Sequence, residues 1–229
     1  MQTTIRPYIQ IVQRKMPIVA CNGAQVIDQL GHVVHHVTLN DAVKNAIIDY
    51  ALTHNIQINL YASNQTFSTN RTQWGELYLK RVAVAAPTFV EPNFLRCTPA
   101  TKILLVDDPE RIPSHQAAFT KQVEHRAELV ISEPEYLEFL PAGVNKGAGL
   151  ERLASHLRLM PGHVAAIGDY LNDLEMLKWA GKCAAPANAH PKILDAVRAV
   201  YPSHDKGGVA QFIDAILHNN HEAVKAKKP

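Results

Sequence analysis

The chain has 229 residues, of which 47% are hydrophobic and 19% are charged, and its formal net charge is only +2. That length holds one large domain or two small ones, and so small a charge without a basic face argues against a nucleic-acid partner. The three cysteines, Cys21, Cys97 and Cys183, are odd in number and widely spaced, which favours reduced thiols in a cytoplasmic protein. We expect no signal peptide, because the N-terminus has no apolar h-region, and no membrane span, because no apolar run approaches about 18 residues.

The first part of the chain predicts a buried strand followed by a mixed α+β region. The strand covers residues 18–21, and the pattern changes at about Asp28. From there the periodicity is partly helical and partly alternating, which predicts a separate α+β domain at residues 28–141. Its predicted elements are a hairpin-like region from Gly31, a helix at 41–54, a strand at 56–61 with one face in water, strands at 102–106 and 129–131, and a helix near 115–126.

From residue 142 onward, helical and buried-strand patterns alternate as in a doubly wound sheet. The apolar run Val164–Ile167 ends in Gly168-Asp169-Tyr170-Leu171-Asn172-Asp173, and a helical pattern follows at 174–180. Asp169 and Asp173 are therefore predicted at the carboxyl end of a strand, where open α/β sheets bind ligands. Two carboxylates that converge there repel each other, and a hard cation such as Mg²⁺ would offset that repulsion.

Lys146 opens the helix predicted at residues 147–159. A lysine at this position opposes the helix dipole, which favours anions at the amino end. One interpretation is a solvated surface lysine, the common situation for a single Lys. The other is that the ammonium group and the first-turn amides together hold an anion such as phosphate.

Several motifs occur in one order: Lys146-Gly147, Gly168-Asp169-x-x-Asn172-Asp173, Ala187-Asn188-Ala189 and Gly207-Gly208-Val209-Ala210. This order resembles the C-terminal half of the Cof-type phosphatases, subfamily IIB of the haloacid dehalogenase (HAD) superfamily. Asn22-Gly23-Ala24 is similar to the segment that leads into that family's cap. The resemblance implies an α/β fold: a HAD-like, doubly wound parallel-sheet core at residues 1–27 and 142–229, with an inserted α+β cap at residues 28–141.

The resemblance also implies a mechanism, phosphoryl transfer through an aspartyl phosphate. Lys146 would neutralise the phosphate and orient the nucleophile, Asp169 would ligate Mg²⁺, and Asp173 would hold the metal or its waters. The substrates implied are small phosphorylated metabolites, sugar phosphates among them. Asn172 and Thr4 would bind phosphate oxygens, and Arg6 and Asn22 are further candidates for substrate contacts.

The family's first motif, D-x-D-G-T, which carries the nucleophile, does not occur in this sequence. The second motif, T-G-R, survives only as Thr4-Ile5-Arg6. We therefore predict an N-terminally truncated member whose first core strands are missing. Three hypotheses stay open: a phosphatase with a misassigned start, an inactive phosphate-binding or regulatory remnant, and a phosphomutase-like relative that needs the same nucleophile. A D-x-D-G-T segment in frame upstream of Met1 would favour the first, and a stop codon there the second.

Other candidate sites have simpler interpretations. Asp107 and Asp108 end a predicted strand like a phosphoacceptor site, but Pro109 follows and removes a backbone donor, which favours two solvated carboxylates. His35 and His36 are adjacent, so on a strand they point to opposite faces and do not share a metal. Cys183 lies in a short apolar run that predicts an inert buried thiol.

Overall fold

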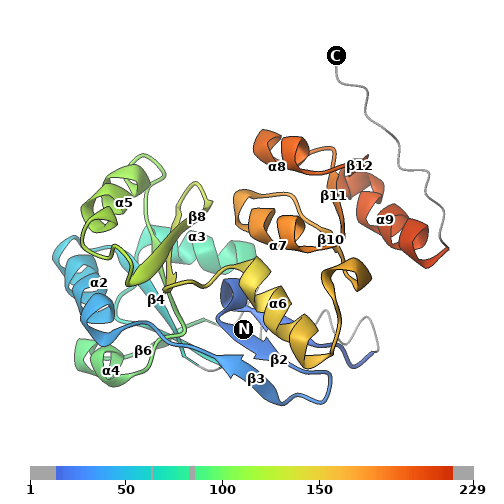
Figure 1. The fold of residues 1–229 in the computed structure, drawn as a ribbon. Helices are drawn as coiled ribbons and strands as arrows, with labels where there is room; N and C mark the ends of the chain where they lie inside the picture. Colours follow the sequence, from blue (N-terminus) through green and yellow to red (C-terminus); the bar gives the residue numbers. More distant parts are fainter. Residues whose placement is uncertain (1–13, 63, 83–85, 219–229) are drawn as a thin grey trace. The chain divides into compact units, whose positions relative to one another are not determined.

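The computed structural model describes residues 14–62, 64–82 and 86–218 (Figure 1). By packing, the chain divides between Val144 and Asn145 into two compact units, which we describe separately. Together they confirm a mixed α/β fold with a parallel-sheet component. The predicted grouping of residues 1–27 with residues 142–229 in one core domain stays a prediction.

The first unit contains two sheets and four helices among its described residues. A three-stranded antiparallel sheet has the order β1-β2-β3, and a short 3₁₀ helix, Cys21–Gly23, links its first two strands. The larger sheet has six strands in the order β6-β5-β4-β7-β9-β8. The elements are β1 (Ile18–Ala20), β2 (Gln25–Ile27), β3 (Val33–His36), α2 (Asp41–Thr53), β4 (Gln57–Ala62), β5 (Gln65–Ser68), α3 (Gln73–Val82), β6 (Thr88–Phe89), α4 (Pro92–Cys97), β7 (Lys102–Val106), α5 (Ile112–Thr120), β8 (Ala127–Glu133) and β9 (Tyr136–Pro141).

The predicted helix and strands of this region are largely confirmed. The helix expected at 41–54 is α2, which begins after Asn40 because the Asn40 side chain accepts hydrogen bonds from the amides of Ala42 and Val43. The strand expected at 102–106 is β7. The expected helix near 115–126 is α5, but it begins and ends earlier, at Ile112 and Thr120, with Pro113 in its first turn, where proline is well tolerated.

The core of the first unit lies on one face of the six-stranded sheet. Aliphatic and aromatic residues of the central strands alternate toward this face and pack against residues of α2, α4 and α5. Members of this cluster include Ile58, Leu60, Ile103, Leu105, Leu137 and Phe139 from the sheet, with Ile47, Leu95 and Phe119 from the helices.

The other face of β4 is also buried, which corrects the expectation of a strand with one face in water. All six residues of β4 are buried. Helix α3 supplies the cover: the Tyr61 and Tyr78 hydroxyls lie 2.5 Å apart, and the Thr72 amide before α3 donates to the Gln57 side chain. The alternating pattern predicted the side on which each residue lies, but polar side chains such as Gln57 do not show whether another element covers them.

The second unit is a small three-layer α/β/α structure. Its parallel sheet has the order β10-β11-β12. Leu177 of α7 and Ile193 of α8 pack with Ala166 and Ala185 on one face, and Phe212 of α9 packs on the other. The elements are α6 (Lys146–His156), β10 (Ala165–Ile167), α7 (Leu174–Trp179), β11 (Lys182–Pro186), α8 (Pro191–Ala196), β12 (Ala199–Tyr201) and α9 (Gly208–Leu217).

Helices on both faces of a parallel sheet make this unit doubly wound, as the sequence predicts. Strand β10 lies within the predicted 164–167 and α7 within 174–180. Among the helices of the described residues, none is long and apolar enough to cross a membrane.

Replacing Phe139 by alanine tests the packing of the larger core. Phe139 is fully buried, and its ring meets that of Phe119 with centroids 4.9 Å apart. We expect Phe139→Ala to lower the free energy of unfolding by roughly 3–5 kcal/mol, because a cavity remains. Urea denaturation followed by circular dichroism measures this, with exposed Phe94→Ala (47% exposed) as the control. An equal effect of both substitutions would contradict the assigned core.

Candidate functional site

The candidate site begins where β10 ends. After Ile167 the chain passes through Gly168 and Asp169 into a 3₁₀ turn, Leu171–Asp173, and then into α7. The Asp169 carbonyl accepts a hydrogen bond from the His190 amide at 2.8 Å. This hydrogen bond connects the turn to the start of α8. The turn is therefore fixed both by β10, which it follows, and by α8.

The Asp173 carboxylate is the centre of this turn. Asp173 is only 4% exposed. Its Oδ2 accepts hydrogen bonds from the amides of Asp169 at 2.9 Å and Tyr170 at 3.1 Å, and its Oδ1 accepts from Lys146 Nζ at 2.5 Å. Residue 168 must be glycine here, because a Cβ atom would lie 2.5 Å from that of Asp173. The carboxylate therefore holds the turn in place and orients the lysine.

Lys146 is the first residue of α6, as predicted, but it is not a solvated surface lysine. Its side chain is 32% exposed and paired with Asp173. The helix begins here because the Asn145 side chain accepts a hydrogen bond from the Ala148 amide at 2.8 Å. At residue 147, a Cβ atom would lie 2.7 Å from the Glu175 backbone, so glycine permits α6 to approach α7 closely. The ion pair offsets the unfavourable position of a cation at a helix start.

Asp169 differs from Asp173 although both were predicted as metal ligands. Its side chain is exposed and has no hydrogen bond or ion pair with the residues that the structure describes. Its carboxylate oxygens are therefore open to a ligand. Asn172 lies in the same turn and is partly exposed. The structure thus brings Lys146 to Asp173 and places Asp169 and Asn172 in the turn beside them.

Asn22 lies in the first unit, in the 3₁₀ turn after β1. Its backbone has a φ of 52°, and Cys21 before it has a φ of 50°, a left-handed conformation that asparagine tolerates better than most residues. The Asn22 amide donates to Glu138 Oε2 at 2.9 Å. The predicted substrate contacts at Thr4 and Arg6 lie outside the described residues.

Glu138 connects Asn22 to a largely buried polar group that the sequence did not predict. Its Oε1 accepts hydrogen bonds from Lys102 Nζ at 3.1 Å and Ser132 Oγ at 2.8 Å. Burial has the largest single effect on the Lys102 pKa and lowers it, but the charge and hydrogen bond of Glu138, together with the nearby Cys21 and Tyr78, raise it by more, so the net pKa is above its ordinary value. The residues come from different strands and share no sequence pattern, so only the pairing of β9 with β7 and β8 reveals them.

Asp107 also differs from its predicted solvated state. It is 4% exposed, and its Oδ2 lies 2.8 Å from His115 Nε2, whose Nδ1 lies 3.0 Å from the Tyr50 hydroxyl. Arg111 pairs with the same carboxylate at 3.0 Å. These contacts join β7, α5 and α2. Within the described ranges, no group of three or more His, Cys, Asp or Glu residues has metal-binding geometry.

Comparison with known proteins identifies the family. The model of the haloacid dehalogenase-like hydrolases matches residues 1–213. The chain belongs to this family. A curated relative, YxeH of Bacillus subtilis (strain 168), is named a candidate phosphatase; it is 27% identical over an alignment of 226 residues that covers 96% of this chain and 80% of the relative.

Two solved structures have a similar fold. TM0651 from Thermotoga maritima is 26% identical, with a TM-score of 0.81, and the match covers 93% of this chain and 80% of that one. The HAD subclass IIB sugar phosphatase BT4131 has a TM-score of 0.82 at 13% identity, over 92% and 79% of the two chains. The resemblance to Cof-type HAD phosphatases is thereby confirmed, and the chain is a member of a family of hydrolases.

Asp173→Asn tests whether this carboxylate organises the turn. The variant keeps an acceptor for one amide but loses the charge that pairs with Lys146. We expect the free energy of unfolding to fall by roughly 1.5–3 kcal/mol, the range for hydrogen bonds to charged groups. Urea denaturation measures it, with Asp195→Asn, an exposed residue of α8, as the matched control. Equal stability of the two variants would show that the Asp173 contacts do not hold the turn.

Glu138→Gln tests the charge pair with Lys102, whose side chain is only 15% exposed. A lysine whose pKa is higher in the folded than in the unfolded state stabilises the fold. This stabilisation is fully present below the pKa of the unfolded state and is lost as pH rises through the pKa of the folded state. We expect the variant to be less stable by roughly 1.5–3 kcal/mol near pH 7. The deficit should stay constant up to about pH 10.4, the lysine pKa of the unfolded chain, and shrink above it as pH rises through the higher folded pKa of Lys102.

The measurement is urea denaturation at a series of pH values, with Glu128→Gln, an exposed residue of β8, as the control. A deficit that does not change with pH would mean that the carboxylate acts through packing and not through its charge.

Proposed function

We propose that this chain carries the phosphate- and Mg²⁺-binding part of a Cof-type phosphatase for small phosphorylated metabolites, in the turn after β10, without the family's D-x-D-G-T nucleophile motif among its 229 residues. The contact of Lys146 with Asp173, at the carboxyl end of a parallel strand, is the observation that supports this most. It places a cation, an open carboxylate and the start of α6 at the sheet edge where α/β proteins bind ligands.

The residues of the turn fit Mg²⁺. This ion commonly binds one or two carboxylates and completes its shell with water and substrate phosphate. Asp169 presents an exposed carboxylate, whereas the Asp173 oxygens already accept from Lys146 and two amides. Asp169 would therefore be the direct ligand and Asp173 would orient the site. When bound, the ion would polarise a phosphoryl oxygen.

Lys146 would neutralise a phosphate at this edge. Its pairing with Asp173 directs the ammonium group toward the turn, so the cation is preorganised instead of rotating freely in water. Asn172, in the same turn, would donate a hydrogen bond to a phosphate oxygen. Arg6, Thr4 and Asn22 stay candidates for further contacts.

The substrate class and the role of the α+β region are part of the same proposal. Residues 28–141 would act as a cap that closes over the leaving group and excludes water. The fold shared with the sugar phosphatase BT4131 supports a sugar-phosphate-like substrate, whose sugar is the leaving group. In the reaction that the family resemblance implies, the aspartate of a D-x-D-G-T motif, which does not occur in these 229 residues, would attack phosphorus as the bond to the leaving group breaks, and water would then hydrolyse the aspartyl phosphate.

A second candidate function is phosphate binding without turnover. It is favoured by one observation: no D-x-D-G-T motif occurs in the 229 residues. Without that carboxylate, the lysine and the turn still bind an anion, but no residue in the predicted position accepts the phosphoryl group. We therefore expect these 229 residues to bind phosphate and not to hydrolyse its esters.

Turnover of p-nitrophenyl phosphate with and without Mg²⁺ tests this expectation directly. We expect no hydrolysis above background. Mg²⁺-dependent hydrolysis that disappears in Asp169→Ala would show that another carboxylate serves as nucleophile, and the proposed inactivity would be wrong.

Binding of inorganic phosphate tests the site itself. In the presence of Mg²⁺, calorimetric titration of the Lys146→Ala variant should give a Kd roughly tenfold to a hundredfold higher than that of the unchanged chain. Lys192→Ala, an exposed lysine of α8, is the matched control. An unchanged Kd in Lys146→Ala would refute this location of the phosphate site.

A further inference from the structure

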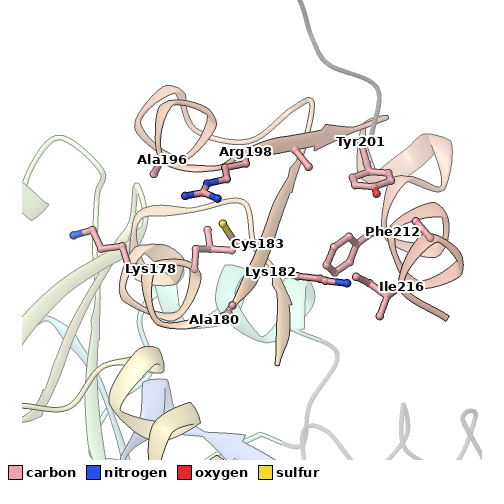
Figure 2. Close-up of a pocket in the computed structure, with 13 residues that line it drawn as sticks. Lys178, Ala180, Lys182, Cys183, Ala196, Arg198, Tyr201, Phe212 and Ile216 are labelled. Atoms are coloured by element: carbon pink, nitrogen blue, oxygen red, sulfur yellow. The ribbon is translucent and has the colours of Figure 1, made fainter. Parts of the chain in front are cut away.

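The second unit contains a cavity of about 460 Å³ that the proposed reaction does not use (Figure 2). It is formed by residues of α7, β11, β12 and α9 and by the segment between α8 and β12. Its lining includes none of the proposed site residues Lys146, Asp169, Asn172 or Asp173. Its volume is in the range of small-molecule sites.

The charged residues that line the cavity are all cations: Lys178, Lys182 and Arg198. Lys178 donates to Glu175 Oε1 at 2.8 Å and is thereby neutralised. Lys182 and Arg198 have no ion pair with any residue in the described ranges. A concave surface with one sign of charge concentrates ions of the opposite sign. The cavity therefore favours an anion.

The rest of the lining is mostly apolar and surrounds these cations. The rings of Tyr201 and Phe212 meet with centroids 5.5 Å apart. In Figure 2 the Lys182 side chain extends toward Phe212 and Ile216, whereas Cys183, the next residue of β11, lies on the other side of the strand, as alternation along a strand requires. Arg198, which precedes β12, also lies on that other side. Apolar surface beside a cation suits a ligand with both an apolar body and a negative group.

We propose that this cavity is a second binding site, for a small organic anion with an aromatic or alkyl body. The body packs against Phe212 and Ile216, and the negative group pairs with Lys182, which extends on the same side of β11. The proposal is independent of the phosphatase assignment, because it rests on residues outside the phosphate site.

Fluorescence titration with 8-anilinonaphthalene-1-sulfonate tests the proposal, since this probe joins an aromatic body to a sulfonate. We expect saturable binding, with a Kd that rises roughly threefold to tenfold in Lys182→Glu and changes less in Arg198→Glu, on the other side of β11. N-phenyl-1-naphthylamine, which lacks the sulfonate, should bind both variants and the unchanged chain alike. Lys192→Glu on α8 is the charge-matched control outside the cavity, and Lys146→Ala is the control for the phosphate site.

An unchanged Kd for the sulfonate in Lys182→Glu would overturn the proposal, as would an equal loss in Arg198→Glu or Lys192→Glu or a loss confined to Lys146→Ala.

Discussion

The candidate site depends on the hydrogen bonds and the ion pair of the buried Asp173 carboxylate. This carboxylate accepts two backbone amides from the turn after β10 and the ammonium group of Lys146 from the start of α6. A buried carboxylate is costly unless it is paired and hydrogen-bonded, and here each oxygen has a donor. The same contacts that satisfy Asp173 leave Asp169 exposed, so one aspartate is structural and the other is open to a ligand.

The second unit therefore has two candidate binding sites, at different parts of its small parallel sheet. The turn after β10 combines acidic residues with one lysine. Carboxylates are suitable ligands for a metal ion, and the lysine is suitable for binding a phosphate. The cavity around β11 and β12 is lined by cations and apolar side chains, which suits an organic anion. In the first unit, Glu138 plays a part comparable to that of Asp173, because it joins side chains from separate strands.

Elements with a clear hydrophobic period could be predicted from the sequence. Helix α2 and strand β7 match their expected ranges, and the Gly-Asp end of β10 located the candidate turn. The burial of polar side chains could not be predicted in this way. In the sequence, Asp107 has the pattern of a solvated carboxylate at the end of a strand. In the structure, His115 and Arg111, which follow it in the chain, bind this carboxylate. The pairing of Lys146 likewise required a partner 27 residues away.

The sequence by itself determined the family resemblance, the order of the motifs and the position of Asp169 and Asp173 at a strand end, because these depend on local residue spacing. Only the tertiary structure decided which of the two carboxylates is engaged, why residue 168 must be glycine, and that Lys182 and Arg198 line one cavity. These properties depend on distances between segments that are separate in the chain, and hydrophobic periodicity does not encode such distances.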